Sequence, residues 1–232
     1  MIEEPPLLTV KRPSRRPTAD QIAAFQNMPT SFVVDAMYGA GALSPVIRPL
    51  GEGRDLDCRA AGPALTVDNG PADILALHAA LGLIAPGDIV VSSFQGHQGC
   101  AAAGDRISAM IKNCGAAGFV TDGPMRDYAG LLKVGLPSWC TGLNPGSPFC
   151  SGPGRVGFAV QIGGQQVETG DMIVADRDGV VVVPFDAIGE VIEMLHKVSE
   201  LEAALDAELQ RGLKVPADIR ELMASDRVRY VD

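Results

Sequence analysis

Residues 118–121 form a short apolar run, Gly-Phe-Val-Thr, that stops at Asp122, Gly123 and Pro124. A run of this length that ends at turn-forming residues is typical of a buried strand. In α/β proteins the carboxyl ends of such strands are where ligand sites are built. Arg126 and Asp127 follow the turn directly. The sequence therefore predicts an α/β fold in which these two side chains lie side by side at the end of a buried strand.

The segments before this strand support the same class of fold. A capping box of Thr18 and Gln21 predicts the start of a helix. Further helices are expected over 30–38, 73–83 and 98–114, and buried strands over 64–67 and 88–92. Gly104 then falls in the middle of a helix. Strands and helices thus alternate up to the strand that ends at Asp122.

The second half of the chain has a different pattern. Residues 156–167 alternate around Gly163 and Gly164, which predicts a hairpin, and 171–176 and 179–183 are expected to be consecutive strands. We expect these strands to form a β-rich layer against the α/β half.

The last 47 residues are charged and helical. A long helix is predicted from 186 to 209 and a short one near 217–224. The apolar stripe of this segment is too narrow for a core of its own. We therefore divide the chain into an α/β domain with an N-terminal arm, 1–185, and a C-terminal helical extension, 186–232, that packs on the body or on a neighbouring subunit.

Composition excludes some classes of partner. A formal net charge of −9 argues against nucleic acid, because binding a phosphate backbone requires a basic surface. The basic pairs Lys11-Arg12 and Arg15-Arg16 are expected to lie on a solvated arm. The apolar stretch 74–91 is interrupted by Pro86-Gly87-Asp88, so no membrane partner is expected. The acidic N-terminus lacks the features of a secretory signal, which predicts a cytoplasmic protein.

Arg126 and Asp127 suit a small oxo acid. A guanidinium can bind a carboxylate through two parallel hydrogen bonds, while a neighbouring carboxylate holds a hard divalent cation such as Mg²⁺ or Mn²⁺. An equally weighted alternative is that the two residues only pair with each other or cap the next helix.

Two further segments are candidates for the same site. A glycine inside a helix usually has a packing or ligand reason, so Gly104 draws attention to Asp105, although Asp105 could instead be an exposed charge paired with Arg106 or Arg59. The Gly-rich loop before it, with Gln95, Gly96, His97 and Gln98, could grip a carboxylate or phosphate through its backbone amides.

Other chemistries find little support. Three histidines cannot form a convincing metal site; His78, placed among leucines, is expected in the core or at an interface, and His196 on the surface. The five cysteines are scattered and odd in number, which favours reduced thiols over a metal or redox site. Each of the five lysines has polar or helix-end neighbours, so none suits a Schiff base.

Four motifs in this order resemble the RraA-like family: Gly104-Asp105, Asp122-Gly123-x-x-Arg126-Asp127, Gly135-Leu136-Pro137 and the 170–183 segment with its four consecutive valines. That family includes divalent-metal-dependent 4-hydroxy-4-methyl-2-oxoglutarate / 4-carboxy-4-hydroxy-2-oxoadipate aldolases and the regulator of RNase E activity A. The resemblance runs from about Thr30 to the C-terminus and implies an α/β/α sandwich of the swivelling β/β/α type. The segments 200–204 and 229–231 look like the C-terminal extension of the aldolases.

The resemblance also implies roles for individual residues. Asp127 would ligate Mg²⁺ or Mn²⁺, and Arg126 would bind the keto oxygen of the substrate and stabilise an enolate. Asp105 matches an acidic residue that orients a metal-bound water, and Glu202 matches a glutamate that a neighbouring subunit supplies to this water. Gly104 and the loop 95–98 would contact the substrate, but this loop departs from the aldolases, which leaves substrate identity open.

The implied activity is cleavage of a 4-hydroxy-2-oxo acid to pyruvate or oxaloacetate, with decarboxylation of oxaloacetate as a side reaction, in a homotrimer or homohexamer. Two alternatives stay open. One is a non-catalytic protein that binds an RNA-degrading enzyme, and the other is a lyase or decarboxylase acting on another oxo acid.

Overall fold

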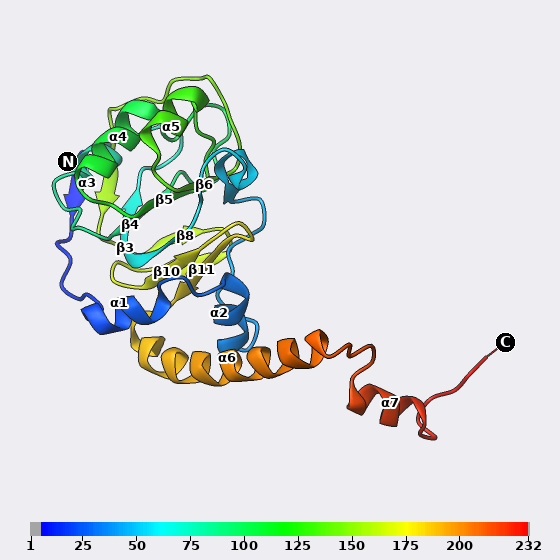
Figure 1. Cartoon of the computed structure of the whole chain (residues 1–232). Coiled ribbons are helices and arrows are strands. Elements are labelled where there is room, and N and C mark those ends of the chain that lie inside the picture. Colours follow the sequence, from blue (N-terminus) through cyan, green and yellow to red (C-terminus); the bar gives the residue numbers. More distant parts are fainter. Residues whose placement is uncertain (1–5, 232) are drawn as a thin grey trace.

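The computed structural model describes residues 6–231. Residues 1–5, whose acidic character supported the expectation of no export signal, lie outside the described part. The body consists of sheets with helices on both sides, and a long helical segment leaves it at one end (Figure 1).

A nine-stranded mixed sheet forms the centre of the body. Its main path runs in the order β1-β7-β3-β4-β5-β6-β2, and β10 and β11 extend from β3. The bounds are β1 Leu8–Val10, β2 Arg48–Pro49, β3 Ala60–Asp68, β4 Ile89–Ser93, β5 Gly118–Thr121, β6 Ser138–Cys140, β7 Gly154–Val156, β10 Met172–Ala175 and β11 Val180–Val183. Strands β3 to β6 are parallel, as expected for the α/β half.

The long strand β3 joins the two halves. Its first residues pair antiparallel with β10, and from Ala64 onward it pairs in parallel with β4. Strands β10 and β11 pair antiparallel with each other. The predicted hairpin around Gly163 and Gly164 is confirmed as β8, Val160–Ile162, paired with β9, Gln165–Val167. One strand therefore belongs to both the α/β half and the β-rich layer.

Helices cover both sides of these strands. On one side lie α3 Leu75–Ala80, α4 Asp105–Asn113 and α5 Tyr128–Val134; on the other lie α1 Ala19–Phe25, α2 Thr30–Ala36 and α6 Ile188–Gln210. Short 3₁₀ helices span Leu50–Gly53 and Phe185–Ala187, and α7 spans Ala217–Met223. The capping box of Thr18 and Gln21 is present.

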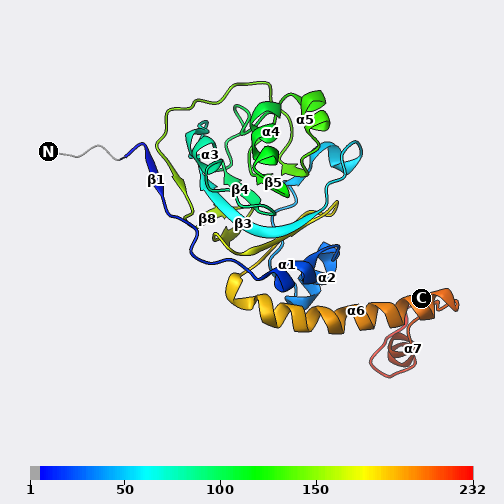
Figure 2. The same ribbon diagram turned by 60° about the vertical axis from the view of Figure 1, so that its left-hand side comes forward.

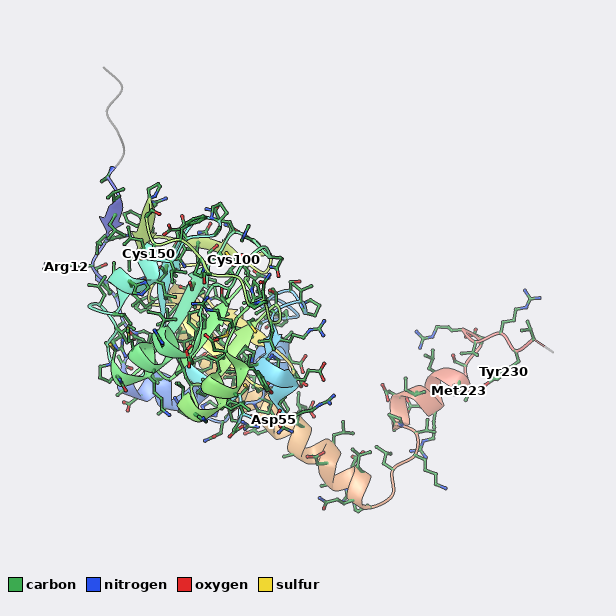
Figure 3. The ribbon with its side chains drawn as sticks, turned by 90° about the horizontal axis from the view of Figure 1, so that it is seen from above. Arg12, Asp55, Cys100, Cys150, Met223 and Tyr230 are labelled. Carbon is green, nitrogen blue, oxygen red and sulfur yellow. The ribbon has the colours of Figure 1, made fainter. Side chains whose placement is uncertain are left out.

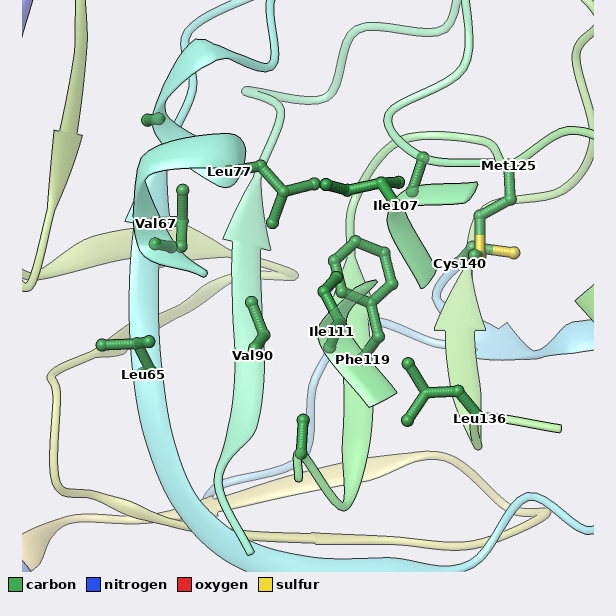
Figure 4. Close-up of a cluster of buried hydrophobic side chains, with 14 of the residues drawn as sticks. Leu65, Val67, Leu77, Val90, Ile107, Ile111, Phe119, Met125, Leu136 and Cys140 are labelled. Carbon is green, nitrogen blue, oxygen red and sulfur yellow. The ribbon is translucent and has the colours of Figure 1, made fainter. Parts of the chain in front are cut away.

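The core under α3, α4 and α5 fixes these helices on the sheet. Strand residues such as Val90 and Phe119 pack against Leu77 of α3 and Ile107 and Ile111 of α4 (Figure 4). All five are buried. Burying an aliphatic or aromatic side chain contributes about 1.5–3 kcal/mol. The loops that connect strands to these helices are therefore anchored at both ends.

Two expectations about local structure were wrong. Gly104 does not interrupt a helix: it is the N-cap residue of α4, which begins at Asp105, and the chain from 98 to 103 is loop. Lys11 and Arg12 are exposed, as expected for a solvated N-terminal arm, but Arg15 and Arg16 contact the body. Arg15 bonds Glu168 at 2.8 Å and lies 3.5 Å from Asp171, and Arg16 pairs with Asp88. Because Asp88 and Asp171 are buried, pairing places the arm on the body.

The C-terminal extension is anchored only at its start. Ile188, Val191 and Leu195 are buried among residues of α1 and α2. Beyond them α6 projects from the body, with Leu201 and Leu209 exposed (Figures 1 and 2). Figure 3 places Met223 and Tyr230 far from the body. None of the helices in the described part of the chain is long and apolar enough to cross a membrane.

Candidate active site

Three loops meet at the carboxyl ends of β4 and β5 and hold one another through backbone hydrogen bonds. Ala102 N–H donates to the carbonyl of Pro124 at 2.7 Å, and Arg126 N–H donates to Ala103 at 3.0 Å. On the other side, Asn144 N–H donates to Met125 at 2.9 Å. The loop that carries Arg126 and Asp127 therefore lies between the loop before α4 and the segment after β6.

Asp122, at the end of β5, fixes the loop after β4 through its side chain. Its carboxylate accepts hydrogen bonds from the amides of Phe94 at 2.5 Å and Gly96 at 2.9 Å. Burial raises the pKa of Asp122, and these amide bonds oppose that shift. The side chain is thus occupied in fixing the loop after β4. The side chains of Arg126 and Asp127, which follow on the same loop, are partly exposed.

Asp127 keeps its carboxylate free of the helix that follows. It is the N-cap residue of α5 and has left-handed backbone angles, φ 63° and ψ 47°, but its side chain makes no capping hydrogen bond. A non-glycine residue in this region is uncommon and is often found at functional sites. Half of the side chain is exposed, at 51%. The helix-cap alternative is therefore not what this geometry shows.

Arg126 has two neighbours. Its Nε lies 3.5 Å from Oδ2 of Asp127, and its Nη1 donates a hydrogen bond to the hydroxyl of Ser147 at 2.5 Å. The distance of 3.5 Å between Nε and Oδ2 is long for an ion pair, and this contact involves only one N–H group of the guanidinium. Ser147, which no sequence pattern singled out, fixes the direction of the side chain.

Two glycines allow the close approach of α4 to the start of α5. A Cβ atom at Gly104 would lie 2.9 Å from Oδ2 of Asp127, and one at Gly130 would lie 2.4 Å from Oδ2 of Asp105. Both contacts are too short for a real side chain. Asp105 forms no ion pair with any residue in the described chain, so the alternative that pairs it with Arg106 or Arg59 is not what the structure shows.

Gly104, Asp105, Arg126 and Asp127 line one cavity of about 620 Å³. This volume lies in the usual range for small-molecule sites. Its polar wall contains Gly104, Asp105, Arg106, Arg126, Asp127 and His78, and its apolar wall contains Ile74, Ala103, Ile107, Met110 and Pro148. The first turn of α4, whose N-cap glycine has no capping side chain, opens into the cavity. Free amides there favour a carboxylate.

The other predicted site residues lie elsewhere. None of the residues Gln95, Gly96, His97 and Gln98 lines this cavity in the described chain. Gln95 donates to Asp68 at 3.1 Å, Gln98 donates to the carbonyl of Asp122 at 2.9 Å, and the His97 ring packs edge-on against Phe94. Glu202 belongs to α6. The second half of this helix projects from the body, away from α4 and α5 (Figure 1).

Sequence reasoning did not place two polar residues, Arg106 and His78, in the cavity wall. Arg106 follows Asp105 directly, and this adjacency was the available signal. His78 is not a core residue: it is exposed, because the buried face of α3 is formed by Ala76, Leu77 and Ala80. The helical spacing of those three positions places residue 78 on the opposite face. His196 is exposed on α6, as expected.

The side chains of the cavity wall suit a hard divalent cation that takes few of its ligands from the protein. No group of three or more His, Cys, Asp or Glu side chains is arranged to hold a metal ion among the described residues. Mg²⁺ commonly keeps several waters and uses one or two carboxylates together with substrate oxygens. Asp127, half exposed at the cavity wall, would hold such an ion, with water and substrate completing its coordination.

Comparison with known proteins identifies the family. Residues 30–182 match the RraA-like family model, described as Aldolase/RraA. This chain belongs to the RraA-like family. It is 34% identical over 184 residues to a protein of Halalkalibacterium halodurans named "Putative 4-hydroxy-4-methyl-2-oxoglutarate aldolase", covering 79% of this chain and 84% of that one. A protein of Alkalilimnicola ehrlichii with the same name is 32% identical over 144 residues, 60% of this chain and 84% of that one.

Solved structures confirm the α/β RraA-like fold. A structure of Streptomyces coelicolor RraAS2, described as an unusual member of the RNase ES inhibitor RraA protein family, superposes with a TM-score of 0.71 and 25% identity over 83% of this chain and all of that one. An uncharacterized protein from Pseudomonas syringae gives a TM-score of 0.73 at 23% identity, over 86% of this chain and 96% of that one.

Proposed function

We propose that this protein is a divalent-metal-dependent aldolase that cleaves a 4-hydroxy-2-oxo acid and releases pyruvate or oxaloacetate. The observation that carries the proposal is the meeting of the α4 N-terminus, Arg126 and Asp127 in one cavity. Relatives named as aldolases support the same class of reaction. A substrate such as 4-hydroxy-4-methyl-2-oxoglutarate or 4-carboxy-4-hydroxy-2-oxoadipate suits the size and polarity of this cavity.

The residues divide the binding of the 2-oxo acid between them. The free amides at the start of α4, beside Gly104, would hold its carboxylate. Arg126 would donate to the keto oxygen, where negative charge develops as the C3–C4 bond breaks. Ser147 holds the guanidinium in place, so little reorganisation is needed at that moment. Mg²⁺ or Mn²⁺ held by Asp127 would supply Lewis-acid stabilisation of the same enolate charge.

Cleavage without a Schiff base is consistent with the cavity wall. No lysine lines the cavity in the described residues, so an amine is not available there to form an imine. The enolate must then be stabilised by positive charge at the keto oxygen. Asp105, held in the space over Gly130, would orient a water that returns a proton to C3. Decarboxylation of oxaloacetate proceeds through the same enolate and is proposed as a side reaction.

We further propose that the active assembly is a homotrimer or homohexamer in which Glu202 of a neighbouring subunit reaches the site. The projecting half of α6 exposes Leu201, Leu205 and Leu209, at 70%, 42% and 53%. A row of leucines at this spacing forms an apolar stripe that is stabilised by burial against another surface. Such an arrangement brings an acidic residue to the water beside Asp105 only in the oligomer.

A non-catalytic regulator is the competing proposal, and the likeness to a structure from the RNase ES inhibitor family favours it. A lyase or decarboxylase acting on another oxo acid is a third candidate. The decisive measurement is pyruvate release from 4-hydroxy-4-methyl-2-oxoglutarate, followed by a coupled dehydrogenase. Activity should disappear with EDTA and return with Mg²⁺ or Mn²⁺.

Arg126 variants test the proposed role of the guanidinium in the same assay. Arg126→Ala should reduce kcat by about 100-fold or more, the scale of removing one donor from a developing oxyanion. Arg126→Lys should recover little, because an ammonium cannot reproduce the planar guanidinium. Full turnover in EDTA, or near-normal rates in both variants, would refute the proposed mechanism; a protein that releases no pyruvate from any hydroxy-oxo acid would favour the regulator.

A further inference from the structure

Arg106 is a charged residue of the cavity wall to which the proposed mechanism gives no role. It is the second residue of α4 and is exposed, and it forms no ion pair with any residue of the described chain. A guanidinium stays protonated in proteins and can bind a carboxylate through two parallel hydrogen bonds. Its place in the cavity decides which carboxylate of a bound substrate it can reach.

Two contacts define the side of α4 that faces α5. Asp105 lies against Gly130 of α5, where a Cβ atom would come within 2.4 Å of the Asp105 Oδ2. Lys112, two turns further along α4, donates a hydrogen bond to the carbonyl of Val134 at the end of α5. Residues seven apart lie on the same face of a helix. Asp105 therefore points toward α5, the helix whose first turn follows the proposed reaction site.

Arg106 belongs to the opposite side of α4. Successive residues of a helix are rotated by about 100°, so Arg106 does not share the face of Asp105. Met110, one turn later, lies on the face of Arg106 and also lines the cavity. Ile74 and His78, from the start of α3, complete this end of the wall. Because α4 lies between α3 and α5 (Figures 1 and 2), the cavity extends from α5 to α3, and Arg106 is on the α3 side.

The charges of the wall suit a substrate with two carboxylates. The wall contains two guanidinium groups, Arg106 and Arg126, and two carboxylates, Asp105 and Asp127. Their charges cancel, so a bound divalent cation leaves an excess of positive charge equal to its own. A 2-oxo acid with a second carboxylate is a dianion and balances this excess. A monocarboxylate would leave one guanidinium without an anion.

The two carboxylates of such a substrate lie at opposite ends of its carbon chain. In the proposed binding mode the C1 carboxylate is held by the free amides at the start of α4, and the keto oxygen by Arg126. The C5 carboxylate of 4-hydroxy-4-methyl-2-oxoglutarate lies beyond the bond that breaks. We infer that Arg106 binds this C5 carboxylate, so that the site selects hydroxy-oxo acids with two carboxylates; the inference rests on the proposed function.

The kinetic test compares two substrates that differ only at C5. In 4-hydroxy-4-methyl-2-oxopentanoate a methyl group replaces the C5 carboxylate, and cleavage of either compound releases pyruvate. Arg106→Gln should lower kcat/KM for the dicarboxylate by about 10-fold or more, the scale of a hydrogen bond to a charged group. The value for the monocarboxylate should stay within about twofold of wild type.

Two further variants complete the kinetic test. Arg106→Lys should keep part of the preference for the dicarboxylate, because it retains the charge without the planar fork. Arg59→Gln replaces an exposed arginine that does not line the cavity, and it is the matched control. It should change neither kcat/KM value.

Binding of 2-oxo acids that cannot be cleaved tests Arg106 without turnover. In titration calorimetry with Mg²⁺, the wild type should bind 2-oxoglutarate about 10-fold or more tightly than 2-oxopentanoate. Arg106→Gln should remove this preference. Oxalate is too short to extend beyond the keto-acid end and should bind both proteins equally. A loss of oxalate affinity in Arg106→Gln would assign Arg106 to the C1 carboxylate and overturn the inference.

The outcomes separate this inference from the proposed function. If Arg106→Gln leaves the ratio of the two kcat/KM values unchanged, or if the wild type binds 2-oxoglutarate and 2-oxopentanoate equally, the role of Arg106 is overturned while cleavage itself stands. If the wild type shows the Arg106-dependent binding preference but releases no pyruvate from either substrate, the proposed function fails and the dicarboxylate subsite stands.

Discussion

At the residue scale, the site depends on Gly130, because the absence of a side chain there leaves the space that Asp105 occupies. Gly130 lies inside α5, where alanine is normally favoured by about 1 kcal/mol. Here a Cβ would meet the carboxylate of Asp105 at 2.4 Å and its Cβ at 2.7 Å. The position of Asp105 is therefore set by a neighbouring helix that has no side chain at that point.

Gly130→Ala should displace Asp105 and slow cleavage by about 10- to 100-fold, because displacement of a reacting group by about 1 Å has effects of this size. The free energy of unfolding should also fall, by about 1–3 kcal/mol, because a contact of 2.7 Å with Cβ of Asp105 requires the packing of α4 on α5 to shift. Gly189→Ala is the control, since a Cβ at that helical glycine meets nothing within 4 Å. Steady-state kinetics and urea unfolding of both variants check the prediction. Equal rates in the two variants would mean that the packing of Asp105 against α5 has no part in catalysis.

At the scale of elements, the side chain of Asp73 connects the start of α3 to residues 151–152, which follow the cavity-wall residue Pro148. Its carboxylate accepts from Leu75 at 2.8 Å, Ser151 at 2.7 Å and Gly152 at 3.0 Å. Burial acts to raise the pKa of Asp73, but the backbone amides outweigh it and the pKa is lowered. Asp73 thereby holds the chain at Ser151 and Gly152, which follow the cavity-wall residue Pro148, against the start of the helix that carries His78.

Asp73→Asn should reduce the free energy of unfolding by about 1–3 kcal/mol, because one carboxylate oxygen becomes an NH2 group, which in either orientation faces at least one backbone N–H donor. A carboxylate with a lowered folded pKa stabilises the fold above its unfolded pKa of about 3.9 and loses that effect as the pH falls through the folded value. The difference from wild type should therefore be complete at pH 7 and shrink in acid. Urea unfolding across this range measures it. Asp35→Asn, exposed on α2, should show no such difference.

At the scale of the whole molecule, the C-terminal extension determines how subunits are expected to cooperate. A deletion from residue 185 onward would remove Ile188, Val191 and Leu195 from the core under α1 and α2 and would test folding instead of catalysis. Truncation after Ser199 keeps these anchors and removes Glu202 with the exposed leucines. Such a chain should fold, lose the oligomeric contact of the tail and lose cleavage.

Glu202→Gln tests the side chain alone. It should lower kcat strongly while metal affinity stays within about tenfold, because Asp127 is the proposed ligand and proton transfer is the affected step. Mixing Glu202→Gln with Arg126→Ala subunits should regenerate some active sites if the glutamate acts across an interface. With subunit exchange verified by mass spectrometry, a mixture no more active than its parents would rule out a contribution from the neighbouring chain.

Local sequence patterns determined most of the elements and the first part of the site. The apolar run ending at Asp122-Gly123-Pro124 predicted β5 and placed Arg126 and Asp127 at its end, because buried strands and turns depend on nearest neighbours in the chain. The hairpin of β8 and β9 and the capping box at Thr18 were predictable for the same reason. Gly104 was recognised as unusual, but its neighbours did not show that it ends a loop and begins a helix.

The tertiary structure decided which side chains share the cavity. Gln95 to Gln98 have the composition of a binding loop, yet hydrogen bonds to Asp68 and Asp122 and packing on Phe94 engage them elsewhere. His78 and Ser147 join Arg126 from segments some 50 and 20 residues away in sequence. Such contacts depend on how α3 and the segment after β6 pack on the sheet. That packing is set by the whole core, and no local pattern contains it.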